Sequence, residues 1–148
     1  MCYDARNRQV ARTINGVTTV FVWDGWSLLE ERDSAGNLIA DYLHGPVIDE
    51  ILSKTDASGT VYYHHDALGS TVALTDEGGV VVETYRYDVY GSARMFDAFG
   101  APSSESGFGN RFLFAGKESA SEMGIYESRR RAYSPLLGRF LQTDPIGF

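Results

Sequence analysis

The residue with the clearest potential for catalysis is Asp144, which directly precedes Pro145. Two carboxylates that share one proton across a water molecule form an aspartyl protease centre, because the shared proton drives their pKa values apart. Asp88 or Asp97 could act as the second carboxylate only if the fold brings one of them close. An aspartate before a proline is also typical of a turn whose carboxylate binds backbone amides. Asp144 is therefore a catalytic candidate or a turn residue.

The histidines and the cysteine do not form a pattern typical of a metal site. His64 and His65 are adjacent, so on a strand they point to opposite faces, and His44 is distant in sequence. Cys2 is the single cysteine, which excludes an internal disulfide and a thiolate metal site. The chain also lacks the glycine-rich and nucleophile-elbow motifs of nucleotide-binding proteins and hydrolases. We therefore expect neither a metal nor a cofactor.

Aromatic residues offer a further chemical possibility. Trp23 and Trp26, together with nine Tyr and eight Phe residues, could form a platform that binds sugar rings. Aromatic side chains also pack across neighbouring strands and dominate the cores of β-proteins. Packing is the simpler interpretation, and carbohydrate binding remains an alternative.

The charge balance argues against nucleic acid as a partner. The formal net charge is −7 and the pI is near 4.8, and an acidic surface repels phosphate backbones. Arg129–Arg131 is the one basic run, and it reads as a solvated strand edge or a set of partners for nearby carboxylates, with a phosphate site as the minor alternative.

Targeting signals are absent from the sequence pattern. No apolar stretch approaches the roughly 18 residues that a membrane helix needs. The first residues lack the basic-then-apolar order of a signal peptide. We therefore expect no membrane span and no secretion by the general route. The sequence leaves the location open between the cytoplasm, before a specialised export route, and the cell surface.

Turns of the form Asp-x-x-Gly recur along the chain. They separate the segments that must position the candidate residues named above. An aspartate begins such a turn by binding backbone amides, and the glycine supplies the positive φ that lets the strand return. In a second series an aromatic or imidazole ring precedes the aspartate, as in His65-Asp66 and Tyr87-Asp88, and Asn15-Gly16 is a strong hairpin signal by itself. The residues expected to build the turns are Asp33, Asp56, Asp76, Asp88, Gly36, Gly59, Gly69, Gly79 and Gly91.

The segments between the turns predict an all-β fold of repeated hairpins in a curved antiparallel sheet. β-branched and aromatic residues follow each turn, as strands prefer. Along Val80–Tyr87, residues Val81, Glu83 and Tyr85 share one face with Tyr87, and neither face is fully polar, which suits a sheet covered on both sides. Helix is expected at most as a single turn, near Asp49–Ser53 or around Lys117–Met123.

The motifs divide the chain into three parts. Residues 1–100 carry the hairpin repeats, residues 101–110 are rich in Pro, Ser and Gly and are expected to form a flexible loop, and residues 111–148 differ in pattern. Tyrosines recur in both longer parts. Those expected to pack are Tyr63, Tyr85, Tyr87, Tyr126 and Tyr133.

An ordered set of motifs resembles the Rhs (rearrangement hot spot) family, whose bodies consist of tyrosine-aspartate (YD) repeats. The matching segments are Tyr63–Asp76, Tyr85–Gly91, Phe112–Glu118, Gly124–Tyr126, Arg131–Pro135, Leu137–Phe140 and Asp144–Gly147. The last three and their surroundings resemble the RHS repeat-associated core. Its motif residues here are Arg131, Tyr133, Pro135, Gly138, Arg139, Phe140, Asp144, Pro145 and Gly147.

The resemblance implies a structural role. Rhs proteins wind a long β-sheet into a hollow shell that encloses a C-terminal toxin, and the core segment near its end closes the shell. In many members an aspartyl self-cleavage releases the toxin, at a motif later than the one that Asp144–Gly147 matches. The partners implied are neighbouring repeats of a longer bacterial shell and a C-terminal toxin.

Two departures bear on self-cleavage. The family's Arg-Tyr-Tyr-Asp-Pro is Arg131–Pro135 here, with Ser134 at the aspartate position, and Ser119-Ala120 stands where Tyr-Asp is usual. A shell takes several hundred residues, so we expect this chain to be a scaffold piece from a fragment gene, a truncated relic or a longer protein. Alone, it is expected to self-associate through its sheet edges or to unfold in part.

Overall fold

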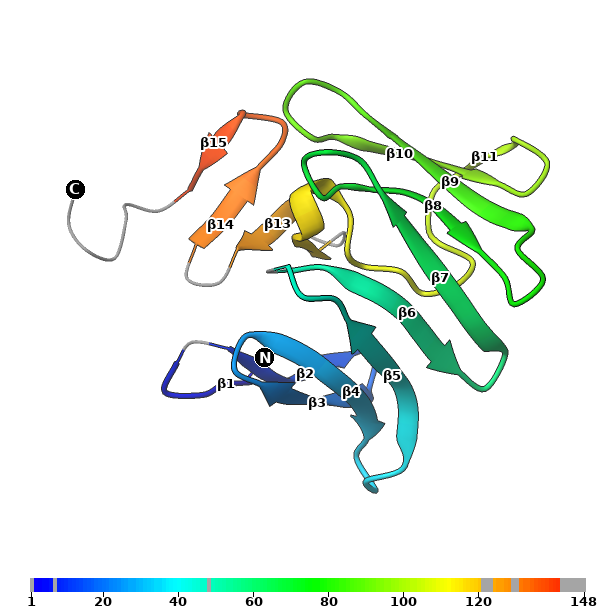
Figure 1. Ribbon diagram of the computed structural model, residues 1–148. Coiled ribbons are helices and arrows are strands. Elements are labelled where there is room, and N and C mark those ends of the chain that lie inside the picture. The colour runs from blue at the N-terminus through cyan, green and yellow to red at the C-terminus, as the bar shows by residue number, and fades with distance from the viewer. Residues whose placement is uncertain (1, 7, 48, 121–123, 129–130, 142–148) are drawn as a thin grey trace. The chain divides into compact units, whose positions relative to one another are not determined.

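The computed structural model describes residues 2–6, 8–47, 49–120, 124–128 and 131–141, which form antiparallel strands and one short 3-10 helix (Figure 1). The expected all-β fold is confirmed. The chain divides into two compact units, residues 1–60 and 61–148. The motifs predict boundaries after residues 100 and 110, which are set by changes in the sequence pattern. The boundary between the two compact units lies instead between Thr60 and Val61 along the chain.

The first unit is a run of antiparallel hairpins. Register is set by the turns: Ile14 pairs with Val17 across Asn15-Gly16. The buried apolar side chains are Phe21, Leu28, Ala40, Tyr42 and Ile51. The strands, hydrogen-bonded in chain order, are β1 (Cys2–Tyr3), β2 (Gln9–Ile14), β3 (Val17–Asp24), β4 (Ser27–Asp33), β5 (Leu38–His44) and β6 (Ile51–Asp56).

The second unit contains further hairpins and a separate four-stranded sheet. The hairpin strands, in hydrogen-bonded order, are β7 (Gly59–His65, which begins just before the division), β8 (Thr71–Thr75), β9 (Val81–Tyr87), β10 (Ala93–Asp97) and β11 (Pro102–Ser103). The 3-10 helix η1 (Phe114–Gly116) precedes the second sheet. Its strands are β12 (Glu118–Ala120), β13 (Ile125–Ser128), β14 (Arg131–Ser134) and β15 (Arg139–Phe140).

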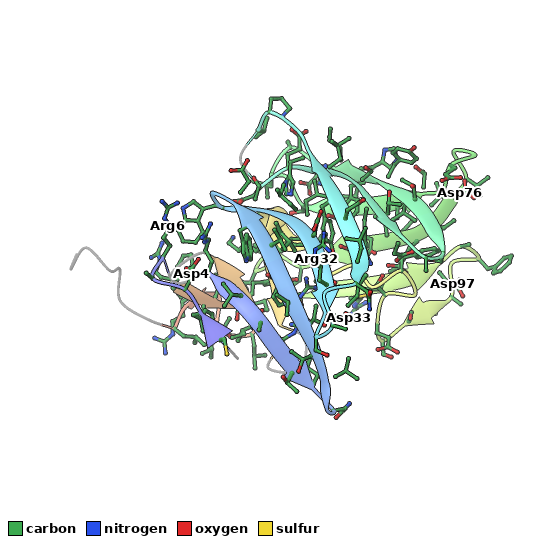
Figure 2. All side chains as sticks on the ribbon, turned by 90° about the horizontal axis from the view of Figure 1, so that it is seen from below. Asp4, Arg6, Arg32, Asp33, Asp76 and Asp97 are labelled. Carbon is green, nitrogen blue, oxygen red and sulfur yellow. The ribbon has the colours of Figure 1, made fainter. Side chains whose placement is uncertain are left out.

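Five turns share one geometry. In each, the Oδ1 atom of an aspartate accepts the N–H groups of the second and fourth residues after it, at 2.8–3.0 Å. The glycine three residues after the aspartate donates its N–H to the aspartate carbonyl at 3.0–3.1 Å and has a positive φ. Figure 2 shows three of these carboxylates at the ends of their strands. The five aspartates are Asp33, Asp66, Asp76, Asp88 and Asp97.

Asp56 begins a different and tighter turn. Only two residues separate β6 from β7, and the carboxylate accepts the N–H and hydroxyl of Ser58, at 2.9 and 2.6 Å. Gly59 has a φ of 121°, outside the range of 79° to 96° found at the five other glycines. The same Asp-x-x-Gly spacing therefore occurs in turns of two different lengths, which the sequence pattern did not distinguish.

The two places expected to hold a helical turn are largely strand where the structure describes them, so the expected placement of the turn is wrong. Residues from Ile51 onward belong to β6, where Ile51 and Ser53 are buried and Leu52 is exposed, the period-2 pattern of a strand. Residues Glu118–Ala120 form β12, and 121–123 lie outside the described residues. The described helical turn is η1, and within the described residues no helix is long and apolar enough to cross a membrane.

The repeated carboxylate turns predict acid sensitivity. Hydrogen bonds from the side chain and N–H of Asn37 lower the pKa of Asp33 below its ordinary value of 3.8, and the N–H of Ser92 does the same for Asp88. A carboxylate whose pKa is lowered by folding contributes stability above its unfolded pKa and loses it as the pH falls through the folded value. We expect the urea midpoint to be steady from about pH 7 to pH 5 and to fall below about pH 4.

The variant Asp88→Asn keeps a side-chain oxygen but removes the charge. It should lower the urea midpoint at pH 7 and make the decline below pH 4 shallower. Glu77→Gln, on an exposed side chain, is the matched control and should leave the profile unchanged. An identical acid profile for Asp88→Asn and the unmodified chain would contradict the assignment.

Candidate functional site

The ring of Phe114, in η1, lies at the centre of an aromatic cluster in the second unit. The centroid distances from this ring are 5.9 Å to Tyr87, 6.1 Å to Tyr126 and 6.2 Å to Tyr133. Tyr87 ends β9, whereas the other two tyrosines belong to β13 and β14 (Figure 1). These four residues, called the junction cluster below, connect the hairpins to the four-stranded sheet. Aromatic pairs at such distances contribute about 0.5–1.5 kcal/mol each beyond the area they bury.

Three tyrosine hydroxyls of the junction cluster donate to backbone carbonyls of the hairpins, two in a turn and one in a strand. Tyr126 donates to the carbonyl of Gly91 at 2.7 Å, and Tyr133 donates to the carbonyl of Tyr90 at 2.9 Å. Both carbonyls belong to the Asp88 turn, which thereby binds two strands of the other sheet. Tyr87 donates to the carbonyl of Thr71, the first residue of β8, at 2.6 Å.

Burial favours the protonated form of the phenols of Tyr87 and Tyr126. It raises the pKa of Tyr87, with smaller contributions from Tyr126 and Asp66, and it raises the pKa of Tyr126, with a smaller contribution from the Asp88 carboxylate. Removing a phenol from water disfavours its anion. The hydroxyls of Tyr87 and Tyr126 therefore remain hydrogen-bond donors throughout the physiological range.

Backbone contacts support the junction from β8. Thr71, which is fully buried, donates its N–H to the carbonyl of Leu113 at 3.0 Å and its hydroxyl to the carbonyl of Phe112 at 2.8 Å. Ser70 accepts the N–H of Ala115 at its hydroxyl oxygen, at 2.8 Å. Ser70 is buried, with 1% of its surface exposed, so this hydroxyl holds η1 in place.

Two glycines allow close approach at the junction. A Cβ atom on Gly91 would lie 2.3 Å from the ring of Phe114, and one on Gly138 would lie 2.7 Å from the ring of Tyr90. Both glycines also have positive φ, 96° and 65°. Glycine is therefore required at each position for two reasons. Its backbone adopts a positive φ without strain, and it has no Cβ atom to collide with the neighbouring ring.

Lys117 adds a cation to the junction cluster. Its ammonium nitrogen lies 5.3 Å from the ring centroid of Phe114 and 5.4 Å from that of Tyr133. Arg131 lies in a similar way over Phe140, at 3.8 Å, and Phe140 packs edge-on against Tyr133. Such cation–π contacts contribute roughly 0.5–2 kcal/mol, depending on burial.

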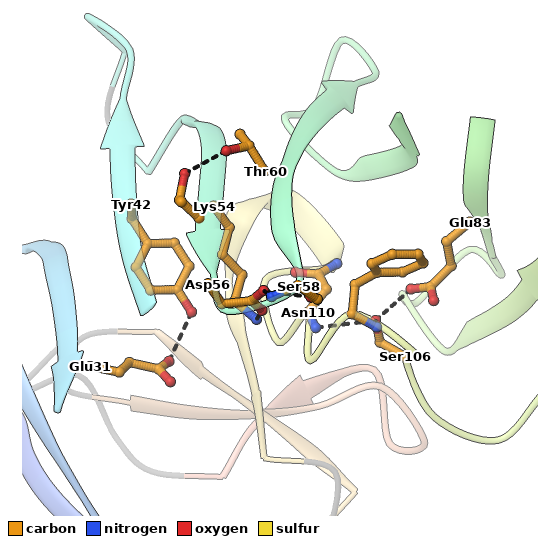
Figure 3. Close-up of polar contacts among 11 residues, drawn as sticks. Glu31, Tyr42, Lys54, Asp56, Ser58, Thr60, Glu83, Ser106 and Asn110 are labelled. Carbon is orange, nitrogen blue, oxygen red and sulfur yellow. Dashed lines mark hydrogen bonds and ion pairs between the residues drawn. The ribbon is translucent and has the colours of Figure 1, made fainter. Parts of the chain in front are cut away.

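A second polar centre surrounds the carboxylate of Glu83, which is 3% exposed on β9 (Figure 3). It accepts the hydroxyl of Ser106 at 2.6 Å, the N–H of Gly107 at 2.9 Å and the hydroxyl of Tyr85. Burial and this carboxylate raise the pKa of Tyr85. Within the segment 101–110, Pro102–Ser103 forms β11, Ser106 and Gly107 donate to Glu83, and Asn110 is buried, while the flexibility expected of this segment stays a prediction.

The residues predicted as the core motif fall in several places. Pro135 is half-buried and Arg139 is exposed. Between the motif residues Tyr133 and Pro135, Ser134, which departs from the family's aspartate, is buried and accepts the N–H of Leu137 at 3.2 Å. The remaining predicted residues, Asp144, Pro145 and Gly147, lie outside the described residues.

The predicted packing tyrosines divide into two groups. Tyr63, Tyr85 and Tyr126 are buried, with 6%, 3% and 3% of their surfaces exposed, and Tyr87 and Tyr133 are half-buried in the junction cluster. All five therefore contribute to packing in the second unit.

The possible carboxylate partners of Asp144 have other roles in the structure. The Oδ1 atoms of Asp88 and Asp97 each bind two N–H groups of their own turns. The Nε2 atom of His64 lies 2.9 Å from the hydroxyl oxygen of Thr75, and the ring of His65 stacks on the ring of Tyr63. Among the described residues, no three His, Cys, Asp or Glu side chains are grouped so as to hold a metal.

Both tryptophans are half-buried in the described structure. The indole N–H of Trp23 donates to the carbonyl of Gln9 at 2.8 Å, and Trp26 also has polar or ring contacts. These positions are consistent with the packing interpretation.

Sequence reasoning missed Glu83 and Phe114 as organising residues. Glu83 shares a strand face with the buried Tyr85, and an acid on such a face is the signal that could have identified it. Phe114 lies within a segment recognised by resemblance, but no local pattern shows which rings it meets.

The chain matches segments of several much larger proteins, although no family model matches it. The tRNA3(Ser)-specific nuclease WapA of Bacillus spizizenii is 32% identical over 145 residues, which are 97% of this chain and 6% of that protein. The double-stranded DNA deaminase toxin A of Burkholderia cenocepacia is 26% identical, over 98% of this chain and 12% of that protein. A chain in the Photorhabdus luminescens Tc holotoxin pore has a TM-score of 0.66 at 17% identity, covering 98% of this chain and 7% of the other.

This chain is homologous over most of its length to a segment of the large Rhs and YD-repeat proteins. The expected family resemblance is thereby confirmed. The chain spans 6% of the length of the WapA nuclease, so the activities in the names of these relatives are not assigned to it.

The Asp88 turn predicts a test of the junction. Gly91→Ala would place a methyl group against Phe114 and force a non-glycine residue to φ 96°, so we expect a loss of about 2–4 kcal/mol in the free energy of unfolding. Gly79→Ala has a similar φ, 79°, with open space around the new methyl group, and should cost only about 1 kcal/mol. Urea denaturation of both variants measures the difference, and equal losses would contradict the packing role of Gly91.

Proposed function

We propose that this chain is a scaffold segment, a wall of hairpins that in a longer Rhs or YD-repeat protein helps to enclose a C-terminal toxin. The observation that carries the proposal is the junction cluster, in which the hydroxyls of Tyr126 and Tyr133 and the ring of Phe114 connect the core segment to the Asp88 turn and to β9. Such contacts serve rigidity, because every donor is already satisfied by a backbone carbonyl of the same unit. The homology to much larger proteins supports the same role.

The partners in this proposal are neighbouring repeats. The end strand of each sheet offers backbone groups for pairing with further strands, in the first unit at β1 and in the second unit at β11, β12 and β15. In the isolated chain a second copy would take their place, detectable as a mass that rises with concentration in light scattering.

A chimera tests the scaffold role in a complete protein. The matching segment of the Bacillus spizizenii relative is replaced by this chain, and limited proteolysis measures whether the region downstream of the segment stays protected. We expect protection equal to that of the unmodified relative. The same chimera with Gly91→Ala should lose protection, and one with Gly79→Ala should retain it.

Loss of protection in the unmodified chimera, while its circular-dichroism spectrum remains that of a β-protein, would contradict the proposal. Equal protection in all three chimeras would show that the junction does not contribute to enclosure.

Self-cleavage and carbohydrate binding are the alternatives, and no contact in the described residues favours either one. Self-cleavage rests on Asp144, outside the described residues, and on a second carboxylate, for which Asp88 and Asp97 are occupied by turn amides. We expect the chain with a C-terminal extension of a folded reporter to keep its intact mass after prolonged incubation. Cleavage that Asp144→Asn abolishes would overturn this expectation in favour of an autoprotease.

A further inference from the structure

The turn between β2 and β3 consists of an asparagine and a glycine at an exposed end of the first unit (Figure 1). Asn15 and Gly16 have φ values of 51° and 79°, and two positive values in succession are those of a type I′ turn. The residues from Thr13 to Val17 are all exposed. A Cβ atom on Gly16 would have nothing within 4 Å, so the space around this part of the backbone is open.

No hydrogen bond holds the side-chain amide of Asn15 or the backbone N–H of Gly16 within the described residues. The side-chain hydrogen bond at this end of the hairpin joins the hydroxyls of Thr13 and Thr18, at 2.8 Å, and leaves the turn itself free. The backbone nitrogen of Gly16 can therefore reach the side-chain carbonyl carbon of Asn15 when the turn rotates. Both groups belong to one short piece of chain, and an intramolecular reaction gains from this proximity.

The other two asparagines of the described residues are restrained. The side chain of Asn37 donates to Oδ2 of Asp33 at 2.9 Å, and its own N–H donates to Oδ1 of the same carboxylate at 2.8 Å. Asn110 is 5% exposed, and its Oδ1 accepts the N–H of Phe112 at 3.0 Å. Each is also followed by a residue with a side chain, which crowds the backbone nitrogen, whereas the residue after Asn15 has none.

We propose that Asn15-Gly16 is a site of spontaneous covalent modification, in which water converts the asparagine to aspartate and isoaspartate. The backbone nitrogen of Gly16 loses its proton to solvent and forms a bond to Cγ of Asn15. The bond from Cγ to the amide nitrogen breaks, and that nitrogen leaves with the proton as ammonia. Water then opens the succinimide ring: cleavage at Cγ gives aspartate, and cleavage at the backbone carbonyl carbon gives isoaspartate.

The two products have different effects on the hairpin. Aspartate followed by glycine suits a type I′ turn as asparagine does, so the aspartate product keeps the pairing of Ile14 with Val17. Isoaspartate adds a carbon atom to the backbone of the turn, and the register of a hairpin depends on the length of its turn. Because β2 joins β1 to the rest of the first unit, loss of the β2–β3 register also releases β1. The modification needs only this hairpin and is independent of the scaffold proposal.

Incubation of the full chain in mildly alkaline buffer prepared with ¹⁸O-labelled water tests the reaction. Peptide mapping by mass spectrometry then identifies each asparagine that has become an acid, and the label excludes conversion during sample preparation. An isoaspartate-specific methyltransferase measures the isoaspartate fraction. We expect conversion at Asn15 to be at least about tenfold faster than at Asn37 or Asn110.

The variant Gly16→Ala tests the role of the unhindered nitrogen. Its methyl group enters open space, so the variant keeps the hairpin at a modest cost in stability from the positive φ. Conversion at Asn15 should slow by about fivefold or more, because the methyl group crowds the attacking nitrogen. Glu77→Gln, in the second unit, is the matched control and should convert at the rate of the unmodified chain.

Hydrogen exchange followed by mass spectrometry tests the effect on the hairpin. In the incubated chain, the amides of β2 should divide into a slow and a fast population, and the fast fraction should equal the isoaspartate fraction. A freshly prepared Asn15→Asp variant has the charge without the longer backbone, and it should give the slow population alone.

The modification site is overturned if Asn15 converts no faster than Asn37, or if Gly16→Ala converts at the rate of the unmodified chain. The proposed effect on the hairpin is overturned if the incubated chain contains isoaspartate at position 15 but its β2 amides exchange as one slow population.

Discussion

The aspartate turn is the interaction on which the rest of the structure depends. One carboxylate oxygen binds two N–H groups that the reversal of the chain would otherwise leave without partners, and a glycine takes the left-handed conformation that closes the loop. Because the same five-residue loop recurs, each strand leaves its turn in a comparable direction. Hairpins then follow one another in chain order within each unit, without crossover connections.

The Asp88 turn does more than reverse the chain. Its internal hydrogen bonds leave the carbonyls of Tyr90 and Gly91 available to groups outside the turn, and two tyrosines of the four-stranded sheet occupy them. Its glycine lacks the Cβ atom that would meet Phe114. One short loop therefore reverses the chain, offers two carbonyl acceptors and leaves space for the Phe114 ring. A turn that belongs to the repeated hairpins can in this way also bind the four-stranded sheet, which is not itself a repeat.

The buried carboxylate of Glu83 likewise binds groups of the segment that follows the last hairpin. A carboxylate removed from water needs donors, and Glu83 receives them from Ser106, Gly107 and Tyr85. These donors hold Ser106 and Gly107 beside β9, in a segment whose composition suggests a loose loop.

The amino-acid sequence by itself determined the all-β class, the positions of the turns and the tyrosines that pack, because turn chemistry and period-2 alternation act between residues close in the chain. Local spacing could not separate the two-residue turn at Asp56 from the longer turns, nor a strand from a helical turn at Ile51–Asp56. Tertiary structure alone decided that Phe114 meets Tyr87, Tyr126 and Tyr133 and that Ser106 reaches Glu83. Those contacts join residues far apart in sequence, and they depend on how two sheets pack, which no local pattern encodes.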